Sequence, residues 1–252
     1  MTAEPRTDVP TDVPTDVPTD IQANIDRYWS GRAASYDDYQ QRPERLPLDL
    51  AAWGEIWSAA LPPAPAEVLD VGTGSGYVAL LLADLGHDVT ATDLADGMLE
   101  RARAHAARAA RAPRFLRGDA VAPDFPDASF DAVTNRYLMW TLREPHRALA
   151  AWRRVLRPGG VLALVDSTWF PEGLHVDTSE DFVRWYDDTV RAALPLAAAR
   201  SIEETRDLVV AAGFRDVTVT PLTSVLELDR EHGVAPDHEV QLQYLVRGVA
   251  GD

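Results

Sequence analysis

The chain has 252 residues, a length that suits one α/β domain with a small appendage or insertion. It contains no cysteine, which excludes disulfide bonds and thiolate metal sites, and all 24 of its basic residues are arginine, which excludes a Schiff-base or P-loop lysine. The formal net charge of −16 makes nucleic acids and anionic membranes poor partners. No apolar run approaches the ~20 residues of a membrane span, and the N-terminus has no apolar signal core. We therefore expect a cytoplasmic monomer or homodimer that acts on a small molecule, with no metal site.

The N-terminal part divides into a repetitive tail and two helices. Residues 7–20 repeat Thr-Asp-Val-Pro, and each proline removes an amide donor, so residues 1–20 are predicted to be a disordered tail. Apolar residues then recur at three- and four-residue spacing over 21–39 and again over 46–61, which predicts two amphipathic helices.

From residue 66 short apolar strands alternate with helices, which predicts a parallel sheet covered on both faces. The five predicted strands are 66–71, 88–93, 114–119, 130–135 and 161–167, and the helix before the last of them ends at Pro158 and the following glycine pair. Residues 168–200 interrupt the alternation and are interpreted as an insertion with one helix over about 179–193. A helix over 202–214 follows, and then two strands, 215–228 and 238–249, whose short connection predicts an antiparallel hairpin.

The segment Val-Leu-Asp-Val-Gly-Thr-Gly-Ser-Gly, residues 68–76, carries the strongest functional signal. A strand leads into Gly72, Gly74 and Gly76, and a helix begins at once, so the backbone can turn sharply and offer free amides to a ligand. Asp93 ends the next strand, where a carboxylate can accept both hydroxyls of a ribose.

Two departures from the dinucleotide fingerprint decide between nucleoside cofactors. Tyr77 stands where the last glycine of Gly-x-Gly-x-x-Gly would permit close helix–strand packing. Asp70 precedes the loop, where it would repel a pyrophosphate but attract an α-amino group. Both features favour S-adenosylmethionine over NAD(P), and an NAD(P)-linked oxidoreductase is the disfavoured alternative.

At these motifs the chain resembles the class I S-adenosylmethionine-dependent methyltransferases, in the group that includes the ubiquinone/menaquinone-biosynthesis type. The resemblance runs from about Asn24 to Phe214 and rests on residues 68–76, 91–99, 118–120 and 156–166. It implies a Rossmann-like, seven-stranded, mostly parallel sheet with an antiparallel C-terminal hairpin, S-adenosylmethionine as cofactor and S-adenosylhomocysteine as product. It also implies that residues 21–62 form a helical lid on a methyltransferase domain, 63–252.

The resemblance assigns most of the expected cofactor site. It implies Asp93 on the ribose, Met98 near the adenine and Asp119 near the adenine amino group, and the remaining expected contacts are Asp70, Gly72, Thr73, Gly74, Gly76, Leu94 and Ala120. In the lid, Tyr28 and Tyr36 are expected near the cofactor, with a packing role as the alternative for Tyr28. Asn135 and Arg136 end the fourth strand, where open α/β sheets bind ligands, and are expected to contact the cofactor or to cap the strand.

The expected acceptor pocket is aromatic. Trp140 replaces a histidine that is common in the family and is either a pocket wall or a core residue, while Trp169 and Trp185 in the insertion are expected to line an apolar pocket. His175, also in the insertion, is the best candidate for a general base. The function expected is methyl transfer to an O, N or C atom of a small aromatic or apolar metabolite, with natural-product biosynthesis as the expected context. A protein that kept the cofactor but has a regulatory or non-methylating role is the alternative.

Overall fold

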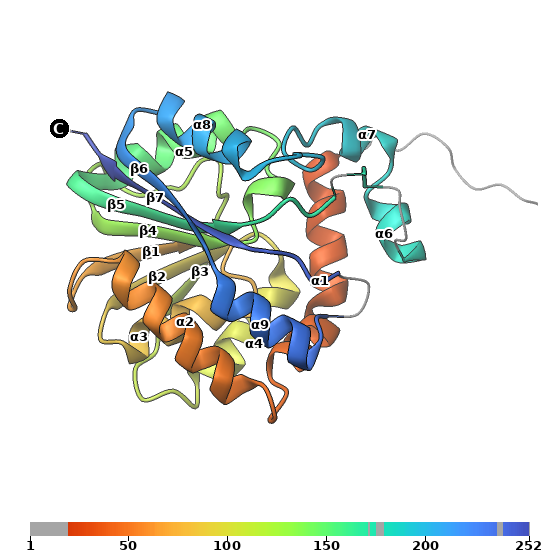
Figure 1. The fold of residues 1–252 in the computed structure, drawn as a ribbon, viewed down its shortest axis with the longest axis horizontal. Coiled ribbons are helices and arrows are strands. Elements are labelled where there is room, and N and C mark those ends of the chain that lie inside the picture. Colours follow the sequence, from red (N-terminus) through yellow and green to blue (C-terminus); the bar gives the residue numbers. More distant parts are fainter. Residues whose placement is uncertain (1–19, 171, 175–178, 236–238, 252) are drawn as a thin grey trace, which may run out of the picture.

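A computed structural model describes residues 20–170, 172–174, 179–235 and 239–251. Seven strands form one sheet in the order β3-β2-β1-β4-β5-β7-β6 (Figure 1). The strands are β1 (Glu67–Val71), β2 (Asp88–Asp93), β3 (Arg114–Arg117), β4 (Phe130–Arg136), β5 (Leu156–Asp166), β6 (Phe214–Pro221) and β7 (Tyr244–Ala250). The pairings among β1 to β5 are parallel, and β7 runs antiparallel to both β5 and β6. The predicted sheet and its antiparallel C-terminal strand are thus confirmed.

Helices cover both faces of the sheet, because the strands are apolar on both sides. On one face α2 (Leu46–Ala60), α3 (Tyr77–Asp84) and α9 (Thr223–His232) pack against alternate residues of the central strands, with Trp53 and Trp57 buried there. On the other face lie α5 (Pro145–Val155) and α8 (Ile202–Ala211), around the fully buried Trp152. The two cores fix the ends of the strands, from which the candidate site is built.

A third group of helices stands apart from these two layers, on the right of Figure 1. It consists of α1 (Ile21–Gln40), α6 (Glu180–Trp185) and α7 (Asp188–Ala192), which share an aromatic core with the short helix η1 (Met139–Thr141). Helix α1 also packs against α4 (Asp96–Ala106) so closely that a Cβ atom on Gly97 would lie 2.5 Å from the carbonyl oxygen of Ser30. About two turns farther along the same pair of helices, His105 Nε2 lies 2.8 Å from the buried carboxylate of Asp37.

One predicted element has the wrong secondary structure. The strand expected over 215–228 ends at Pro221, and the following residues form α9. Proline offers no amide to the sheet, and the buried positions Leu222, Val225 and Asp229 recur at three- and four-residue spacing, as in a helix. The turn expected after residue 228 therefore becomes the end of a helix, and β7 begins only at Tyr244.

Two other boundaries differ from those predicted. The single helix expected over 179–193 is broken into α6 and α7, because the Asp187 side chain accepts a hydrogen bond from the amide of Val190 and begins a new helix. Helix α5 ends at Val155 rather than at the glycine pair, because Leu156 already pairs with Phe130 in the sheet. The predicted tail, apart from Asp20, lies outside the described residues.

Candidate functional site

The loop between β1 and α3 passes close to its neighbours at two of its three glycines, Gly72 and Gly76. Gly72, Gly74 and Gly76 all have positive φ angles, which residues with a side chain rarely adopt. A Cβ atom on Gly72 would lie 2.6 Å from Leu138 Cδ1, and one on Gly76 would lie 2.8 Å from Phe115 Cζ. The loop therefore brings bare backbone to the carboxyl end of β1.

Asp93 joins this loop to the end of β2. Its two carboxylate oxygens accept hydrogen bonds from the amides of Gly74 and Ala95, both at 2.8 Å. Burial raises the pKa of Asp93, and the two amide bonds act in the opposite direction. Each carboxylate oxygen has a second lone pair, so Asp93 can still accept the hydroxyl groups of a ribose.

Asp70, at the end of β1, is 1% exposed. Its Oδ1 accepts a hydrogen bond from the Thr134 hydroxyl at 2.9 Å, whereas the buried Oδ2 has no well-formed hydrogen bond among the described residues. Burial raises the pKa of this carboxyl to about 6, although the Thr73 and Thr134 side chains are near enough to act in the opposite direction. A buried oxygen without a well-formed hydrogen bond costs free energy that an ammonium group would recover. Asp70 lies in a small cleft together with Tyr36, Gln40, the glycine loop and Arg136.

Arg136, at the end of β4, brings a positive charge to the same cleft. Its guanidinium carbon lies 5.0 Å from the ring centre of Trp53, 4.6 Å from that of Tyr77 and 4.7 Å from that of Tyr137. It forms no salt bridge with a carboxylate of the described residues. Because aromatic faces hold a cation without neutralising it, Arg136 remains available to a carboxylate ligand.

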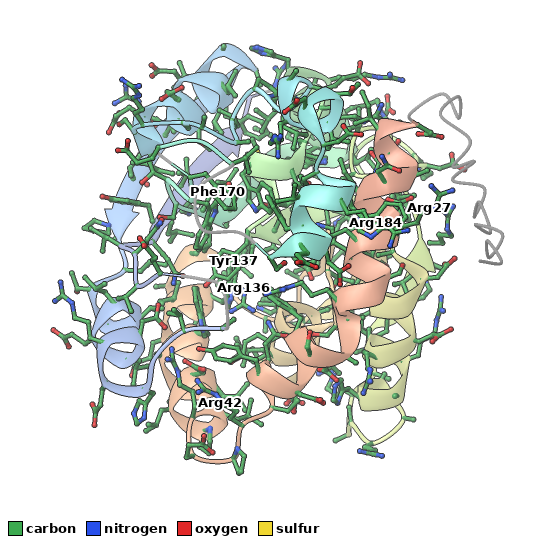
Figure 2. All side chains as sticks on the ribbon, turned by 90° about the vertical axis from the view of Figure 1, so that its right-hand side faces the viewer. Arg27, Arg42, Arg136, Tyr137, Phe170 and Arg184 are labelled. Carbon is green, nitrogen blue, oxygen red and sulfur yellow. The ribbon has the colours of Figure 1, made fainter. Side chains whose placement is uncertain are left out.

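A larger cavity of about 360 Å³ adjoins the loop and has two chemically different ends. One end carries the residues expected around a nucleoside, namely Asp93, Leu94, Met98, Asp119 and Ala120. The other end carries the aromatic residues Tyr137, Trp140, Trp169 and Phe170, and Figure 2 shows Arg136, Tyr137 and Phe170 following one another along this side of the molecule. Helix α1 closes the cavity with Gln22, Ile25, Trp29 and Tyr36.

The segment with α6 and α7, which follows β5, is tied to α1 and η1 at the aromatic end. The side chain of Tyr186 is fully buried. Its hydroxyl oxygen accepts a hydrogen bond from Trp29 Nε1 at 2.9 Å and lies 3.0 Å from the Thr141 hydroxyl. Trp169 is held in turn by Asp166, whose carboxylate accepts from the indole N–H. Burial raises the pKa of Asp166 to about 7. The indole of Trp169 is therefore fixed at the cavity wall rather than left mobile.

The structure brings most of the predicted site residues together. The two cavities are lined by Tyr36, Asp70, Gly72, Thr73, Gly74, Asp93, Leu94, Met98, Asp119, Ala120, Arg136, Trp140 and Trp169.

Four predicted residues do not line either cavity: Tyr28, Gly76, Asn135 and Trp185. Tyr28 packs edge-on against Phe182 and Tyr186, and Trp185 faces arginine side chains. Asn135 is fully buried, and strand alternation points its side chain to the opposite face of the sheet from Arg136. His175 lies outside the described residues.

Sequence reasoning missed the polar part of the cavity wall. Asp229, Gln241 and Gln243 line it, as do Gln22 from α1 and Tyr137 from the end of β4. Asp229 was assigned to a turn because α9 was predicted as a strand. Its helical spacing from Val225 was the one signal that could have placed it.

The described residues hold no helix long and apolar enough to cross a membrane. Within the same ranges, no three His, Asp or Glu side chains are grouped so that they could bind a metal ion.

Comparison with known proteins agrees with this geometry. A family model described as a methyltransferase domain matches residues 69–164. A demethylmenaquinone methyltransferase of Renibacterium salmoninarum is 33% identical over 71% of this chain and 74% of its own length. The enzyme of that name from Thermus thermophilus is 40% identical over 45% of this chain, and the match spans about half of that protein, 53%. The solved phosphoethanolamine N-methyltransferase 2 of Haemonchus contortus shares the fold, with a TM-score of 0.64 at 20% identity over 92% of this chain and 61% of its own.

A glycine loop, an acid at the end of β2 and an antiparallel last strand define an enzyme that binds a nucleoside cofactor without phosphates. The chain belongs to the class I S-adenosylmethionine-dependent methyltransferases. Its cofactor is S-adenosylmethionine. The buried Asp70 oxygen that lacks a well-formed hydrogen bond and the uncompensated charge of Arg136 fit the amino and carboxylate groups of that cofactor.

Proposed function

We propose that the enzyme transfers the methyl group of S-adenosylmethionine to an O, N or C atom of a small aromatic metabolite. One observation carries the proposal: the residues of the nucleoside end and those of the aromatic end line one continuous cavity. Donor and acceptor can therefore meet inside one cavity, which is partly open to solvent.

The residues of the loop and of the three strand ends would hold the cofactor. Asp93 would accept the ribose hydroxyls, Asp119 would face the adenine, Asp70 would bind the amino group, and Arg136 would bind the carboxylate. When bound, S-adenosylmethionine supplies a methyl group that is already activated by its positively charged sulfur. The protein then has to align the acceptor and exclude water, and alignment alone can supply roughly 7–11 kcal/mol.

Helix α1 would serve as the lid that excludes water. It contributes Trp29 and Tyr36 to the cavity wall and is joined to the insertion through the Trp29–Tyr186 hydrogen bond. We propose that α1 closes over the bound cofactor and completes the acceptor pocket.

Trp140, Trp169 and Phe170 support an aromatic acceptor, since flat rings pack favourably against one another in edge-on or offset arrangements. The name of the relatives, demethylmenaquinone methyltransferase, also points to a ring system. We propose a metabolite of this chemical kind, either quinone-like or a natural-product intermediate.

The test is transfer of a tritiated methyl group from S-adenosylmethionine to a panel of phenols, naphthols and aromatic amines. Trp169→Ala should lower kcat/KM at least tenfold, because it removes the fixed wall of the pocket. Trp185→Ala is the matched control, because this tryptophan lies outside both cavities and should leave kcat/KM within twofold. Transfer to aliphatic acceptors only, or equal effects of the two substitutions, would overturn the proposal.

A further inference from the structure

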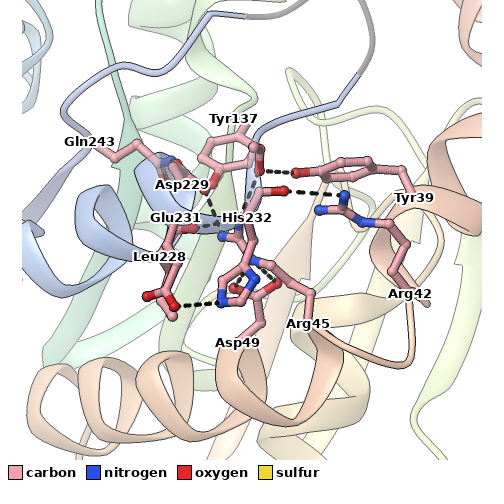
Figure 3. Close-up of polar contacts among 11 residues, drawn as sticks. Tyr39, Arg42, Arg45, Asp49, Tyr137, Leu228, Asp229, Glu231, His232 and Gln243 are labelled. Atoms are coloured by element: carbon pink, nitrogen blue, oxygen red, sulfur yellow. Dashed lines mark hydrogen bonds and ion pairs between the residues drawn. The ribbon is translucent and has the colours of Figure 1, made fainter.

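Four polar side chains form a continuous chain at the aromatic end of the cavity (Figure 3). The Tyr137 hydroxyl donates to Gln243 Oε1 at 2.5 Å, Gln243 Nε2 donates to Asp229 Oδ2 at 3.0 Å, and Asp229 Oδ1 accepts from Arg45 at 2.6 Å. Tyr137, Gln243 and Asp229 all line the cavity. The four residues come from four separate parts of the chain, and none of them is among the residues proposed above to contact the cofactor.

Arg45 anchors the outer end of this chain. Its guanidinium also donates to the carbonyl oxygens of Leu228 and Gly233, at 3.1 and 2.8 Å, and to the carboxylate of Asp49 at 3.0 Å. Burial raises the pKa of Asp229, while the bond to Arg45 acts to lower it. An arginine stays protonated in proteins, so it favours the ionised form of the carboxylate that it touches.

The ionised carboxylate fixes the direction of every hydrogen bond that follows. A carboxylate only accepts, so Gln243 has to turn its NH2 group towards Asp229. Its carbonyl oxygen must then face Tyr137, and the hydroxyl of Tyr137 has to donate its single proton to it. The opposite amide orientation would place oxygen against oxygen at Asp229. Because the single proton of the Tyr137 hydroxyl is already donated to Gln243, this oxygen can only accept a hydrogen bond from a ligand.

Tyr137 is also held rigidly. Its backbone has a φ of 64°, a left-handed conformation that a bulky residue adopts only when its surroundings impose it. Its ring lies edge-on to Trp169 at 4.9 Å between centres and carries the guanidinium of Arg136 on its face at 4.7 Å. Burial raises the pKa of Tyr137 above its ordinary value, so the phenol keeps its proton at neutral pH and is not a base.

We propose that the Tyr137 hydroxyl oxygen is the positioning group for the acceptor, and that it accepts a hydrogen bond from an O–H or N–H group on the aromatic ring system. The acceptor class is thus a phenol or an aromatic amine rather than an ether, and of the quinone-like compounds proposed above only the reduced form, a hydroquinone, has the O–H group to donate. This inference rests on the proposed function and adds the hydrogen-bonding character of the acceptor to it.

The experiment measures the affinity of 1-naphthol and of 1-methoxynaphthalene for the enzyme saturated with S-adenosylhomocysteine. The two probes share one ring system, but only the naphthol can donate a hydrogen bond. The natural enzyme should prefer 1-naphthol by about 3- to 10-fold, the factor expected of one neutral hydrogen bond. Tyr137→Phe should reduce this preference to about onefold.

Asp229→Asn provides the sharper variant, because it should reverse the chain. Arg45 would bind the amide oxygen of the new asparagine, whose NH2 group would then face Gln243. Gln243 would turn over, and Tyr137 would offer its proton to the cavity. The preference should therefore shift towards 1-methoxynaphthalene. Tyr39→Phe is the control, because Tyr39 donates to the Gly233 carbonyl at the outer end of the network and does not line the cavity.

Each outcome decides the question. Equal affinity of the natural enzyme for the two probes, or an unchanged preference in Tyr137→Phe, overturns the role of Tyr137. If Asp229→Asn does not fold, the Tyr137→Phe ratio carries the test, since a ratio measured on one protein is independent of its stability. If neither naphthalene binds while S-adenosylhomocysteine does, the aromatic acceptor of the proposed function fails, and the inference fails with it.

Discussion

Replacing Asp70 with asparagine should stabilise the cofactor-free enzyme and weaken its binding of the cofactor. The carboxyl is almost fully buried, and burial raises its pKa from 3.8 to about 6. At about 1.4 kcal/mol for each tenfold change in proton affinity, keeping Asp70 ionised costs the folded protein about 3 kcal/mol above pH 6. Asparagine keeps an oxygen for the Thr134 hydroxyl and carries no charge.

The sign of the pH dependence follows from the direction of the pKa change. The pKa of the Asp70 carboxyl is higher in the folded protein, about 6, than in the unfolded chain, 3.8. The stability that this carboxyl contributes is therefore fully present below pH 3.8 and is lost as the pH rises through about 6. The advantage of Asp70→Asn should therefore be near zero at pH 4 and approach its full value, up to about 3 kcal/mol, at pH 7.

The assay is urea unfolding of the two proteins without cofactor between pH 4 and pH 8. Asp131→Asn is the control of opposite sign: partial burial acts to raise the pKa of Asp131, but hydrogen bonds from the Glu67 amide and from Arg157 leave it lowered. Its contribution is present above the unfolded pKa and is lost as the pH falls, so its asparagine variant should be the less stable one at pH 7.

Binding is measured separately by calorimetry with S-adenosylhomocysteine. Asp70→Asn should lower the affinity on the order of 10- to 100-fold at pH 7.5, the value of a charge-assisted hydrogen bond. The affinity of the natural enzyme should also fall below pH 6, whereas that of the variant should not. A variant that is no more stable at pH 7 would refute the burial argument, and an unchanged affinity would refute the assignment of Asp70 to the amino group.

Three further changes test the lid and the cofactor site. Gly97→Ala should lower the free energy of unfolding by roughly 1–3 kcal/mol and reduce methyl transfer, because the new Cβ atom would collide with the backbone of α1. Gly31→Ala is the control: this glycine has open space around it, so its substitution should be neutral or stabilising in the same measurements. Tyr36→Ala should weaken S-adenosylhomocysteine binding more than Tyr28→Ala does, and Tyr28→Ala should cause the larger loss in thermal unfolding, because only Tyr36 lines the cavities. Asp93→Ala should cost on the order of 2–4 kcal/mol of cofactor binding by calorimetry, and unchanged binding would disprove its role at the ribose.

The sequence by itself determined the sheet and the class of cofactor. The glycine pattern of residues 72–76, the carboxylates at Asp70 and Asp93, and the alternation of apolar strands with helices are local features. Strand ends that carry these residues must meet at one edge of a parallel sheet, so their proximity follows from topology alone. The distinction between an amino acid and a pyrophosphate followed from the charge of Asp70.

Only the tertiary structure decided the acceptor end. Tyr28 and Tyr36 have the same helical spacing, but the insertion packs on the first and leaves the second at the cavity. The hydrogen bond of Tyr137 to Gln243 joins residues 106 positions apart, and that of Arg45 to Asp229 joins residues 184 apart. No local pattern encodes such pairs, because they depend on how α9 and β7 dock on the sheet, and it is these distant contacts that give each hydrogen bond its direction.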